Sequence, residues 1–288
     1  MHIVSKLFIF FLYPLFSMGT QFLVLPFSSQ ELSLGSHASI SGLAPSNPAL
    51  FSGFDNKPQL YCDRGLWYGE TTVAQFGCNF KSNNTIKHIG IKYSGINDLE
   101  FRDEVPQNSP LSSFSSFGLS FDLGTSIDRG KHKFGFSFSF IHFGIFTEES
   151  QGLGVNLGYA YQINRDFYAG LALQNLGAMN SLYSKKPTLP RRLLLGLSKK
   201  IYFNKYSNNT MASYEYNSLN NKSRFNIGNS FQWNRLKINS GLSISKGVSE
   251  LSFGCAVMIS RYTIDYGIRI GSQGLGIPKI ISLRVLLP

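Results

Sequence analysis

The stretch Lys133-Phe134-Gly135-Phe136-Ser137-Phe138-Ser139-Phe140 places a phenylalanine at every second position, with glycine or serine between them. Side chains alternate between the two faces of a β-strand, so this stretch predicts a strand with one apolar face and one face of small residues. The same alternation occurs in residues 153–161 and 262–270, and similar segments of about ten residues recur from Gln59 to the end of the chain. Such strands suit either a soluble sandwich or a sheet closed in a membrane with lipid outside.

The N-terminus indicates which of these two environments applies. Lys6 precedes an apolar run over residues 7–16, and Ser17-Met18-Gly19 supplies small residues before a cleavage position. This arrangement is typical of a secretory signal peptide, which we assign to residues 1–19. The alternative, an uncleaved membrane anchor, is disfavoured because the run is shorter than the roughly 18 to 20 residues of a spanning helix and is interrupted by Pro14.

The composition agrees with export into a membrane. Of the 288 residues, 43% are hydrophobic and only 15% are charged, 28 are glycine, and the mean hydropathy is −0.04. Strands with one apolar and one polar face average to such neutrality, whereas soluble domains carry more charge. The net charge of +11 becomes +10 when Lys6 leaves with the signal peptide, and the basic residues are scattered without a cluster. We therefore expect contact with anionic lipid or lipopolysaccharide headgroups and no nucleic-acid partner, which would require a basic stripe.

These features predict an all-β fold, namely a closed antiparallel transmembrane β-barrel of about 14 strands over residues 59–288. In lipid, only closure satisfies the backbone of a sheet. Alternate connections are short, whereas three breaks are long, at residues 94–113, 178–189 and 272–278. Short turns at one end and long loops at the other are the arrangement of bacterial outer-membrane barrels, with the long loops outside. The alternation slips at Phe140-Ile141, where we expect a β-bulge.

Residues 20–58 have no strand pattern and contain several prolines and serines. A long stretch of this kind inside a compact protein is usually functional or disordered, and its apolar residues argue against disorder. We expect it to fold as a plug in the periplasmic mouth of the barrel. Within it, Asn47-Pro48-Ala49 either fixes the last bend, since asparagine before proline favours a turn, or forms an element that shifts when a ligand or partner binds.

The polar residues do not predict a catalytic or metal site. The five histidines never occur in pairs at ligand spacing, so we expect no metal, no cofactor and no enzymatic activity. Several charged strand residues fall on the face opposite the large apolar ones and should line the lumen, where they either compensate one another or guide a solute. These residues are Asp122, Glu215, Lys237, Asp265, Arg269 and Arg284.

The cysteines allow one disulfide. Cys62 and Cys78 are symmetric about Glu70, so in an antiparallel hairpin they would stand opposite each other on one face. An oxidising periplasm would permit a bridge. Opposed strand positions give a strained disulfide, however, and a shift of the turn by one residue would separate the two sulfurs. The bridge therefore stays open at this point, and Cys255 is expected to be free.

Several motifs in residues 20 to 202 resemble the PorV and PorQ proteins of the type IX secretion system. The N-terminal signature of that family is a leucine-proline start, an Ala-Leu-Gly-Gly box and an Asn-Pro-Ala motif, and residues 22–35 followed by 46–50 resemble it in this order. The leucine-proline start is closer to PorQ, Ser36 departs from the second glycine of the box, and the Asn-Pro-Ala motif is shared with fatty-acid-channel barrels. Later blocks with a similar resemblance are residues 114–120, 152–158, 170–177, 189–190 and 195–198.

The resemblance implies an outer-membrane component of a type IX secretion-like system that anchors or presents secreted proteins at the cell surface through its extracellular loops. The first long loop carries charges that suit a polar, reversible protein contact. They are Asp98, Glu100, Arg102, Asp103 and Glu104. The alternative is a fatty-acid-channel-like transporter of hydrophobic small molecules. The sequence favours the secretion component, because the expected lumen residues are mostly Gly, Ser, Asn and charged and leave no enclosed apolar pocket.

Overall fold

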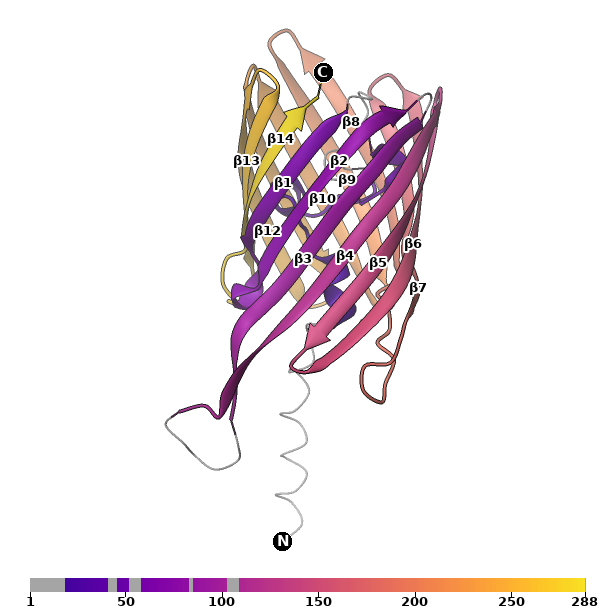
Figure 1. Cartoon of the computed structure of the whole chain (residues 1–288). Helices are drawn as coiled ribbons and strands as arrows, with labels where there is room; N and C mark the ends of the chain where they lie inside the picture. Colours follow the sequence, from indigo (N-terminus) through magenta and orange to yellow (C-terminus); the bar gives the residue numbers. More distant parts are fainter. Residues whose placement is uncertain (1–18, 41–45, 52–57, 83–84, 103–108, 288) are drawn as a thin grey trace.

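The alternating segments form fourteen strands that close into an antiparallel barrel, in which each strand pairs with its neighbours in sequence and β1 pairs with β14 (Figure 1). The computed structural model describes residues 19–40, 46–51, 58–82, 85–102 and 109–287, so the predicted signal peptide lies, apart from Gly19, outside the described residues. The predicted fold class is confirmed. The strands are β1 (Gln59–Leu66), β2 (Thr72–Ser82), β3 (Thr85–Phe101), β4 (Ser112–Arg129), β5 (His132–Ile145), β6 (Glu148–Asn164), β7 (Phe167–Met179), β8 (Arg192–Phe203), β9 (Tyr206–Asn217), β10 (Lys222–Trp233), β11 (Leu236–Ser245), β12 (Val248–Ile259), β13 (Tyr262–Gly271) and β14 (Lys279–Leu286).

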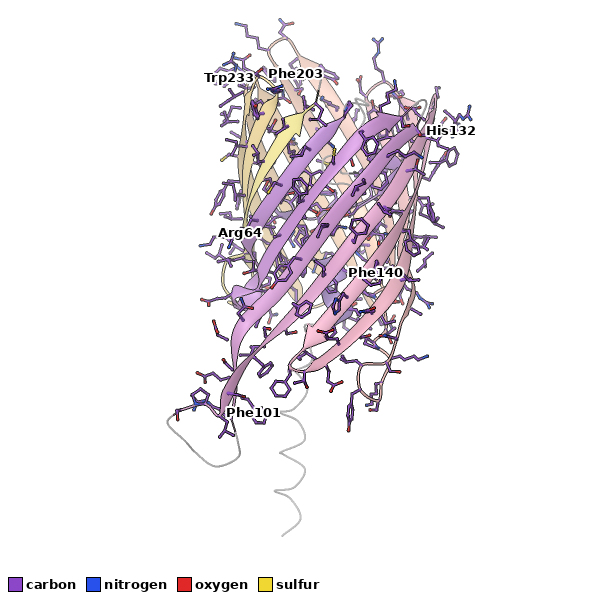
Figure 2. The ribbon with its side chains drawn as sticks, viewed as in Figure 1. Arg64, Phe101, His132, Phe140, Phe203 and Trp233 are labelled. Carbon is purple, nitrogen blue, oxygen red and sulfur yellow. The ribbon has the colours of Figure 1, made fainter. Side chains whose placement is uncertain are left out.

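The outer surface of the barrel is apolar. In β5, Phe136, Phe138 and Phe140 point outward and are exposed, whereas Ser137 and Ser139 point inward and are buried. Figure 2 shows such side chains around the outside of the barrel. A closed barrel with an apolar outer band is the architecture of the bacterial outer membrane, which is where this protein resides. Among the described residues, no helix is both long and apolar enough to cross a membrane.

The two ends of the barrel differ. Connections after even-numbered strands are short turns, and the start of β1 and the end of β14 lie at this short-turn end (Figure 1). Connections after odd-numbered strands include the long ones, so this long-loop end faces outside. The predicted loop 94–113 is mostly strand, because β3 and β4 continue past a bulge between Ile96 and Leu99 and project beyond the barrel as a hairpin. The connection itself is reduced to residues 102–111.

The predicted bulge at Phe140-Ile141 is wrong. The pairing of β5 with β4 and β6 is unbroken there, and Ile141 and Phe143 turn into the lumen with 0% and 4% exposure. The alternation therefore continues, and an apolar inward face replaces a small polar one. The bulge in this region lies between β6 and β7, where the register shifts between Val155 and Leu157.

The expected opposition of Cys62 and Cys78 is also wrong. The β1–β2 connection contains the short 3-10 helix η4 (Tyr68–Glu70), and the hairpin register pairs Cys62 with Phe76 and Cys78 with Leu60. The turn is thus centred one residue earlier than the symmetric position at Glu70. Both cysteines point outward, and all three cysteines of the chain are free.

An arginine on the lipid face should show where the membrane lies. Phe138 is near the middle of β5, so Phe138→Arg is expected to lower the free energy of unfolding by about 2 to 4 kcal/mol. Phe203 lies at the short-turn end (Figure 2), and Phe203→Arg should cost only about 0 to 1 kcal/mol. Urea unfolding in phospholipid vesicles measures both. Equal costs at the two depths would contradict the assignment of the apolar band.

Candidate functional site

The N-terminal segment lies inside the barrel and is called the plug here (residues 19–40 and 46–51). It contains η2 (Thr20–Val24), α2 (Ser29–Leu34) and η3 (Pro48–Leu50), of which α2 contacts β10 to β14 and η3 contacts β4 to β6. Its position differs from the expected one. The plug extends to the long-loop end, where the Thr20 hydroxyl donates to the carbonyl of Thr188, and is not confined to the periplasmic mouth.

Local sequence explains the helix of the plug. The Ser28 side chain accepts a hydrogen bond from the N–H of Glu31 and caps the N-terminus of α2, and Gly35 ends the helix in the left-handed conformation at φ 86°. The helix is short, so packing must stabilise it. All of its residues are buried against the inner wall.

Asn47 of the Asn-Pro-Ala motif joins the plug to the wall. Its Oδ1 accepts from the N–H of Ala49 at 3.0 Å, which caps η3. Its Nδ2 lies 2.7 Å from the carbonyl oxygen of Ser39, 3.2 Å from that of Tyr159 in β6 and 3.3 Å from that of Leu171 in β7. The motif therefore both fixes a bend and contacts the barrel, and Asn47 is fully buried.

Glycines on the inner wall allow this close approach. A Cβ at Gly158 would collide with Asn47 Oδ1, and one at Gly228 would lie 2.6 Å from His37 Nε2. Glycine is needed where a second backbone comes this near. We call the set of glycines that contact the plug the glycine belt. It comprises Gly118, Gly124, Gly135, Gly158, Gly170, Gly196, Gly228, Gly241, Gly254 and Gly267.

The predicted lumen charges do face inward, and ion pairs join five of them to opposite charges. Arg269 has the most partners. Its guanidinium is fully buried, lies 3.3 Å from the Glu250 carboxylate, and donates to the carbonyl of Leu32 at 3.2 Å and to the hydroxyl of Ser36 at 2.9 Å. It also stacks over the Trp67 ring. Arg269 thus binds the C-terminal end of α2 to the wall.

The wall is interrupted next to the plug. The pairing of β7 with β8 ends at Gln174 and Arg192, although β7 continues through residues 175–179. Beyond this point the Asn175 side chain donates to the carbonyl of Pro190 at 2.9 Å. We call this interruption the wall break. It arises from the β6–β7 bulge, which leaves Asn175 at φ 59° with its N–H bonded to Asn156.

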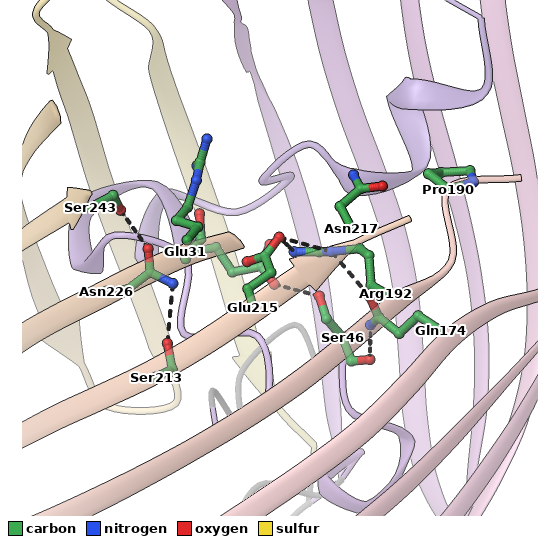
Figure 3. A network of polar contacts seen from close by, with 12 residues as sticks. Glu31, Ser46, Gln174, Pro190, Arg192, Ser213, Glu215, Asn217, Asn226 and Ser243 are labelled. Carbon is green, nitrogen blue, oxygen red and sulfur yellow. Dashed lines mark hydrogen bonds and ion pairs between the residues drawn. The ribbon is translucent and has the colours of Figure 1, made fainter. Parts of the chain in front are cut away.

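A polar network connects the plug to the wall break (Figure 3). The Ser46 hydroxyl donates to Glu31 at 2.6 Å, and the Gln174 amide donates to the carbonyl of Ser46. Arg192 then donates to Gln174 at 3.1 Å and pairs with Glu215 at 2.5 Å. Movement of the plug would break the bond between Gln174 and Ser46, and Gln174 is the residue that Arg192 holds at the wall break.

An apolar cluster lies on the inner side of the wall break. It unites plug residues with inward residues of β2, β5, β7 and β14 and of the β7–β8 connection. Met179 and Leu189, from the two sides of the break, both belong to it. The expectation of a lumen without apolar walls is therefore wrong at this end. The buried members are Phe22, Phe27, Leu32, Val73, Ile141, Phe143, Met179, Leu189 and Ile280.

The remaining space beside the plug is small and polar. A cavity of about 40 Å³ lies between the plug and the inner wall and includes Glu31, Lys92, Asp122 and Gln174 in its lining. This volume suffices for ordered water, but a hydrophobic molecule would require the plug to move.

His37 should make the seating of the plug pH-dependent. Its ring is fully buried, and burial lowers its pKa from 6.5 to about 4. The positive charge of Arg269 also lowers this pKa. The carbonyls of Leu34 and Ile227 and the negative charge of Glu215 raise it, but burial has the larger effect. A released plug would regain the ordinary pKa. As the pH falls from about 6.5 to about 4, the released state binds the proton first, and the seated state loses on the order of 3 kcal/mol.

Conductance across planar bilayers tests this expectation. The conductance of the protein should rise as the pH falls through this window, and His37→Gln should flatten the rise because no proton is taken up. The two proteins then differ at His37 alone. The same pH profile in both proteins would rule out His37 as the group responsible.

Asp98, Glu100 and Arg102, the described members of the charged set proposed for partner binding, belong to the projecting hairpin. Asp98 is exposed at the bulge with φ 58°, and Glu100 and Arg102 form an exposed ion pair at 2.8 Å. Asp103 and Glu104 lie outside the described residues.

The residues that sequence reasoning missed are the glycine belt, Gln174 and Arg192. A glycine at similar depth in successive strands was the available signal. In the described residues, no three His, Cys, Asp or Glu side chains converge as metal ligands would.

Comparison with known proteins agrees with the fold. No family model and no curated protein matches the sequence, so the PorV and PorQ resemblance stays a prediction from motifs. The structure is similar to the toluene transporter TodX of Pseudomonas putida, with a TM-score of 0.65 and 13% identity over 90% of this chain and 96% of TodX. It is also similar to the toluene transporter TbuX of Ralstonia pickettii, with a TM-score of 0.62 and 12% identity over 91% and 98% of the two chains. The likeness is one of fold, and it agrees with the outer-membrane location of an apolar barrel.

Proposed function

We propose that the protein is a plugged channel for small hydrophobic molecules across the outer membrane. The observation that carries the proposal is the apolar cluster at the long-loop end, which adjoins the wall break and is filled by the plug itself. Phe22 and Phe27 place two phenyl rings there with 2% and 3% exposure. Phe22 lies directly on the backbone of Gly118, where a Cβ would collide with its ring. A ligand of similar size and polarity would take the same space when the plug moves.

The wall break supplies a way out of this space. Beyond Gln174 and Arg192 the β7–β8 ladder ends, and the β7–β8 connection takes its place in the wall beside Met179 and Leu189. Leaving sideways into lipid spares an apolar solute the passage through the polar middle of the lumen, where Lys92 and Asp122 lie. The likeness of fold to two toluene transporters supports the same class of solute.

Uptake by intact cells tests the proposal. Cells that lack their own hydrocarbon channels and express this protein should take up radiolabelled toluene faster than cells with an empty vector. Phe22→Ala removes one of the rings that occupy the cluster, so uptake should increase several-fold. Phe138→Ala removes a ring from the lipid face and is the matched control, with uptake unchanged. Uptake equal to the empty vector for all three proteins would contradict the channel.

A second candidate function is docking of a secretion-system or cell-surface protein at the long-loop end. The observation that favours it is the projecting hairpin, whose exposed Phe101 stacks near Phe146 at 6.2 Å, with Phe114 against the same ring at 5.5 Å. Exposed aromatic residues beside a charged pair suit a protein contact. Shortening the hairpin separates the candidates, because a docking protein would lose its partner in pull-downs from solubilised membranes, whereas a channel would keep its toluene uptake.

A further inference from the structure

Two cations from opposite ends of the barrel sequence meet on its outer surface. β14 pairs with β1 to close the cylinder, and in this pairing Lys279 is opposite Leu66 and Ile281 is opposite Arg64. Residues two apart on a strand share a face, so Arg64 and Lys279 are diagonal neighbours within reach of two long side chains. Both are exposed on the outside of the barrel, where Figure 2 labels Arg64. Closure thus creates a basic pair that the scattered basic residues of the sequence did not predict.

No acidic side chain of this wall compensates the pair. β14, β1 and β2 contain a single acidic residue, Asp63, which is buried and points into the lumen. In the part of the chain that the structure describes, neither Arg64 nor Lys279 forms an ion pair or a side-chain hydrogen bond, and Glu70 in η4 pairs with neither. Two like charges side by side repel each other, and on a lipid-facing surface each is costly without an anion beside it. An anionic group of the membrane would supply that partner.

Two hydroxyl groups and two small residues continue this surface on β2 and β3. On the same outer face, Arg64 is opposite Ala74, and Ala74 is opposite Tyr93. The Tyr93 ring lies over Gly95, because a Cβ there would collide with the Tyr93 hydroxyl group. This hydroxyl group therefore points toward the long-loop end, beside Thr72, which is opposite Gly95. Ala74 and Gly95 leave the surface low between the larger side chains. We call this surface the outer basic patch; it comprises Arg64, Thr72, Tyr93 and Lys279.

An apolar surface adjoins the outer basic patch on the same face, toward the membrane centre. Phe76 follows Ala74 by two positions and Ile91 precedes Tyr93 by two, so both point outward, and both are exposed. They are opposite each other in the sheet. Ile281 of β14 is also outward and exposed and extends this surface. Cations and hydroxyl groups thus stand nearer the long-loop end than the apolar side chains, which is the order of the head and the acyl chains of an outer-leaflet lipid.

We propose that the outer basic patch binds lipid A, the phosphorylated glycolipid of the outer leaflet. A phosphate group lies between Arg64 and Lys279, and the sugar hydroxyl groups face Thr72 and Tyr93. The pairing of a guanidinium and an ammonium group suits a phosphate. The long-loop end faces outside, where the leaflet is lipopolysaccharide, and this favours lipid A over a phospholipid. The site is independent of what passes through the lumen.

Native mass spectrometry of the protein in detergent tests the proposal, because the mass identifies each bound lipid. The protein is titrated with lipid A, with monophosphoryl lipid A or with phosphatidylglycerol. We expect lipid A to bind at the lowest concentration and the monophosphoryl form to bind more weakly. The Arg64→Gln/Lys279→Gln variant should lose about fivefold in affinity for lipid A per cation. Ala74→Phe keeps both charges but fills the low part of the surface, so it should weaken lipid A binding several-fold.

Lys222→Gln/Lys246→Gln is the matched control. It removes two exposed cations at the same long-loop end, beside the β9–β10 connection and in the β11–β12 connection. This variant should keep the affinity for lipid A. Heat-modifiable migration on gels confirms that each variant is a folded barrel before titration. Equal affinities for lipid A and phosphatidylglycerol would overturn lipid A as the occupant. An unchanged affinity in the Arg64→Gln/Lys279→Gln variant, or an equal loss in the control, would overturn the outer basic patch as the location.

Discussion

Replacing Arg269 by methionine is expected to lower the free energy of unfolding by about 3 kcal/mol, which is near the lower end of the range for breaking a buried ion pair. The guanidinium is fully buried, and its loss leaves Glu250 without one of its two arginine partners; the other, Arg224, remains at 3.2 Å. It also leaves the carbonyl of Leu32 and the hydroxyl of Ser36 without their donor from the wall. Urea unfolding in phospholipid vesicles measures the change.

Two further variants make this result specific. Arg261→Met removes an exposed rim arginine from the turn that begins β13 and should change stability by no more than about 0.5 kcal/mol. Glu250→Gln in the Arg269→Met background removes a buried carboxylate that keeps only Arg224 as its ion-pair partner, and it should restore part of the loss. A single variant at Arg269 that behaves like Arg261→Met would show that the plug is not bound through this residue.

Alanine at Gly158 is expected to unseat the plug. The new Cβ would collide with Asn47 Oδ1 and lie 2.7 Å from the backbone nitrogen of Ala49, and both belong to the bend that Asn47 fixes against the wall. Overpacking against atoms that cannot turn away costs about 3 kcal/mol. If the barrel is the channel proposed above, its open fraction should then rise about a hundredfold. Single-channel recording in planar bilayers counts the open events.

Gly154→Ala in the same strand is the matched control. Its Cβ would lie 3.3 Å from the end of the Ile141 side chain, which can shift slightly, and 3.8 Å from Ser139 Cβ, which is an ordinary contact. The control should therefore keep the low open fraction of the unaltered protein. Both variants should remain folded barrels, since neither residue takes part in the lipid-facing surface. Equal open fractions for Gly154→Ala and Gly158→Ala would show that the plug does not rest on the glycine belt.

The strands and the inward charges could be predicted from sequence, whereas the glycine belt and the wall break could not. Alternation in β5 gives the correct faces for Phe134 to Phe140, because period and burial agree there. At Ile141 the same rule predicts a bulge, since a sequence does not say whether an apolar side chain meets lipid or a plug. The cysteine pairing depended on the centre of one turn, and η4 moves that centre by one residue.

The glycine belt was hidden for a different reason. In sequence, Gly135 and Gly158 look like any other small residue on the lumen face, and their meaning appears only when the plug lies against them. Arg192 and Gln174 were likewise indistinguishable from other polar strand residues, because Arg192 meets Glu215 through the β8–β9 register and Gln174 meets Ser46 only when the plug lies in the lumen. Local patterns predict elements, but contacts between distant segments determine a site of this kind.

The position of α2 also orders the assembly of the protein in time. The N–H of Ser29 donates to the hydroxyl of Ser282 at 2.9 Å, so a residue that precedes the fourteen described strands finds its partner in β14, the one farthest along the chain. Contacts so far apart along the chain form late in folding, because the intervening loop must close first. The same strand must also pair with β1. The seating of the plug and the closure of the cylinder therefore both depend on β14, and we expect the two to form together as a late step of folding.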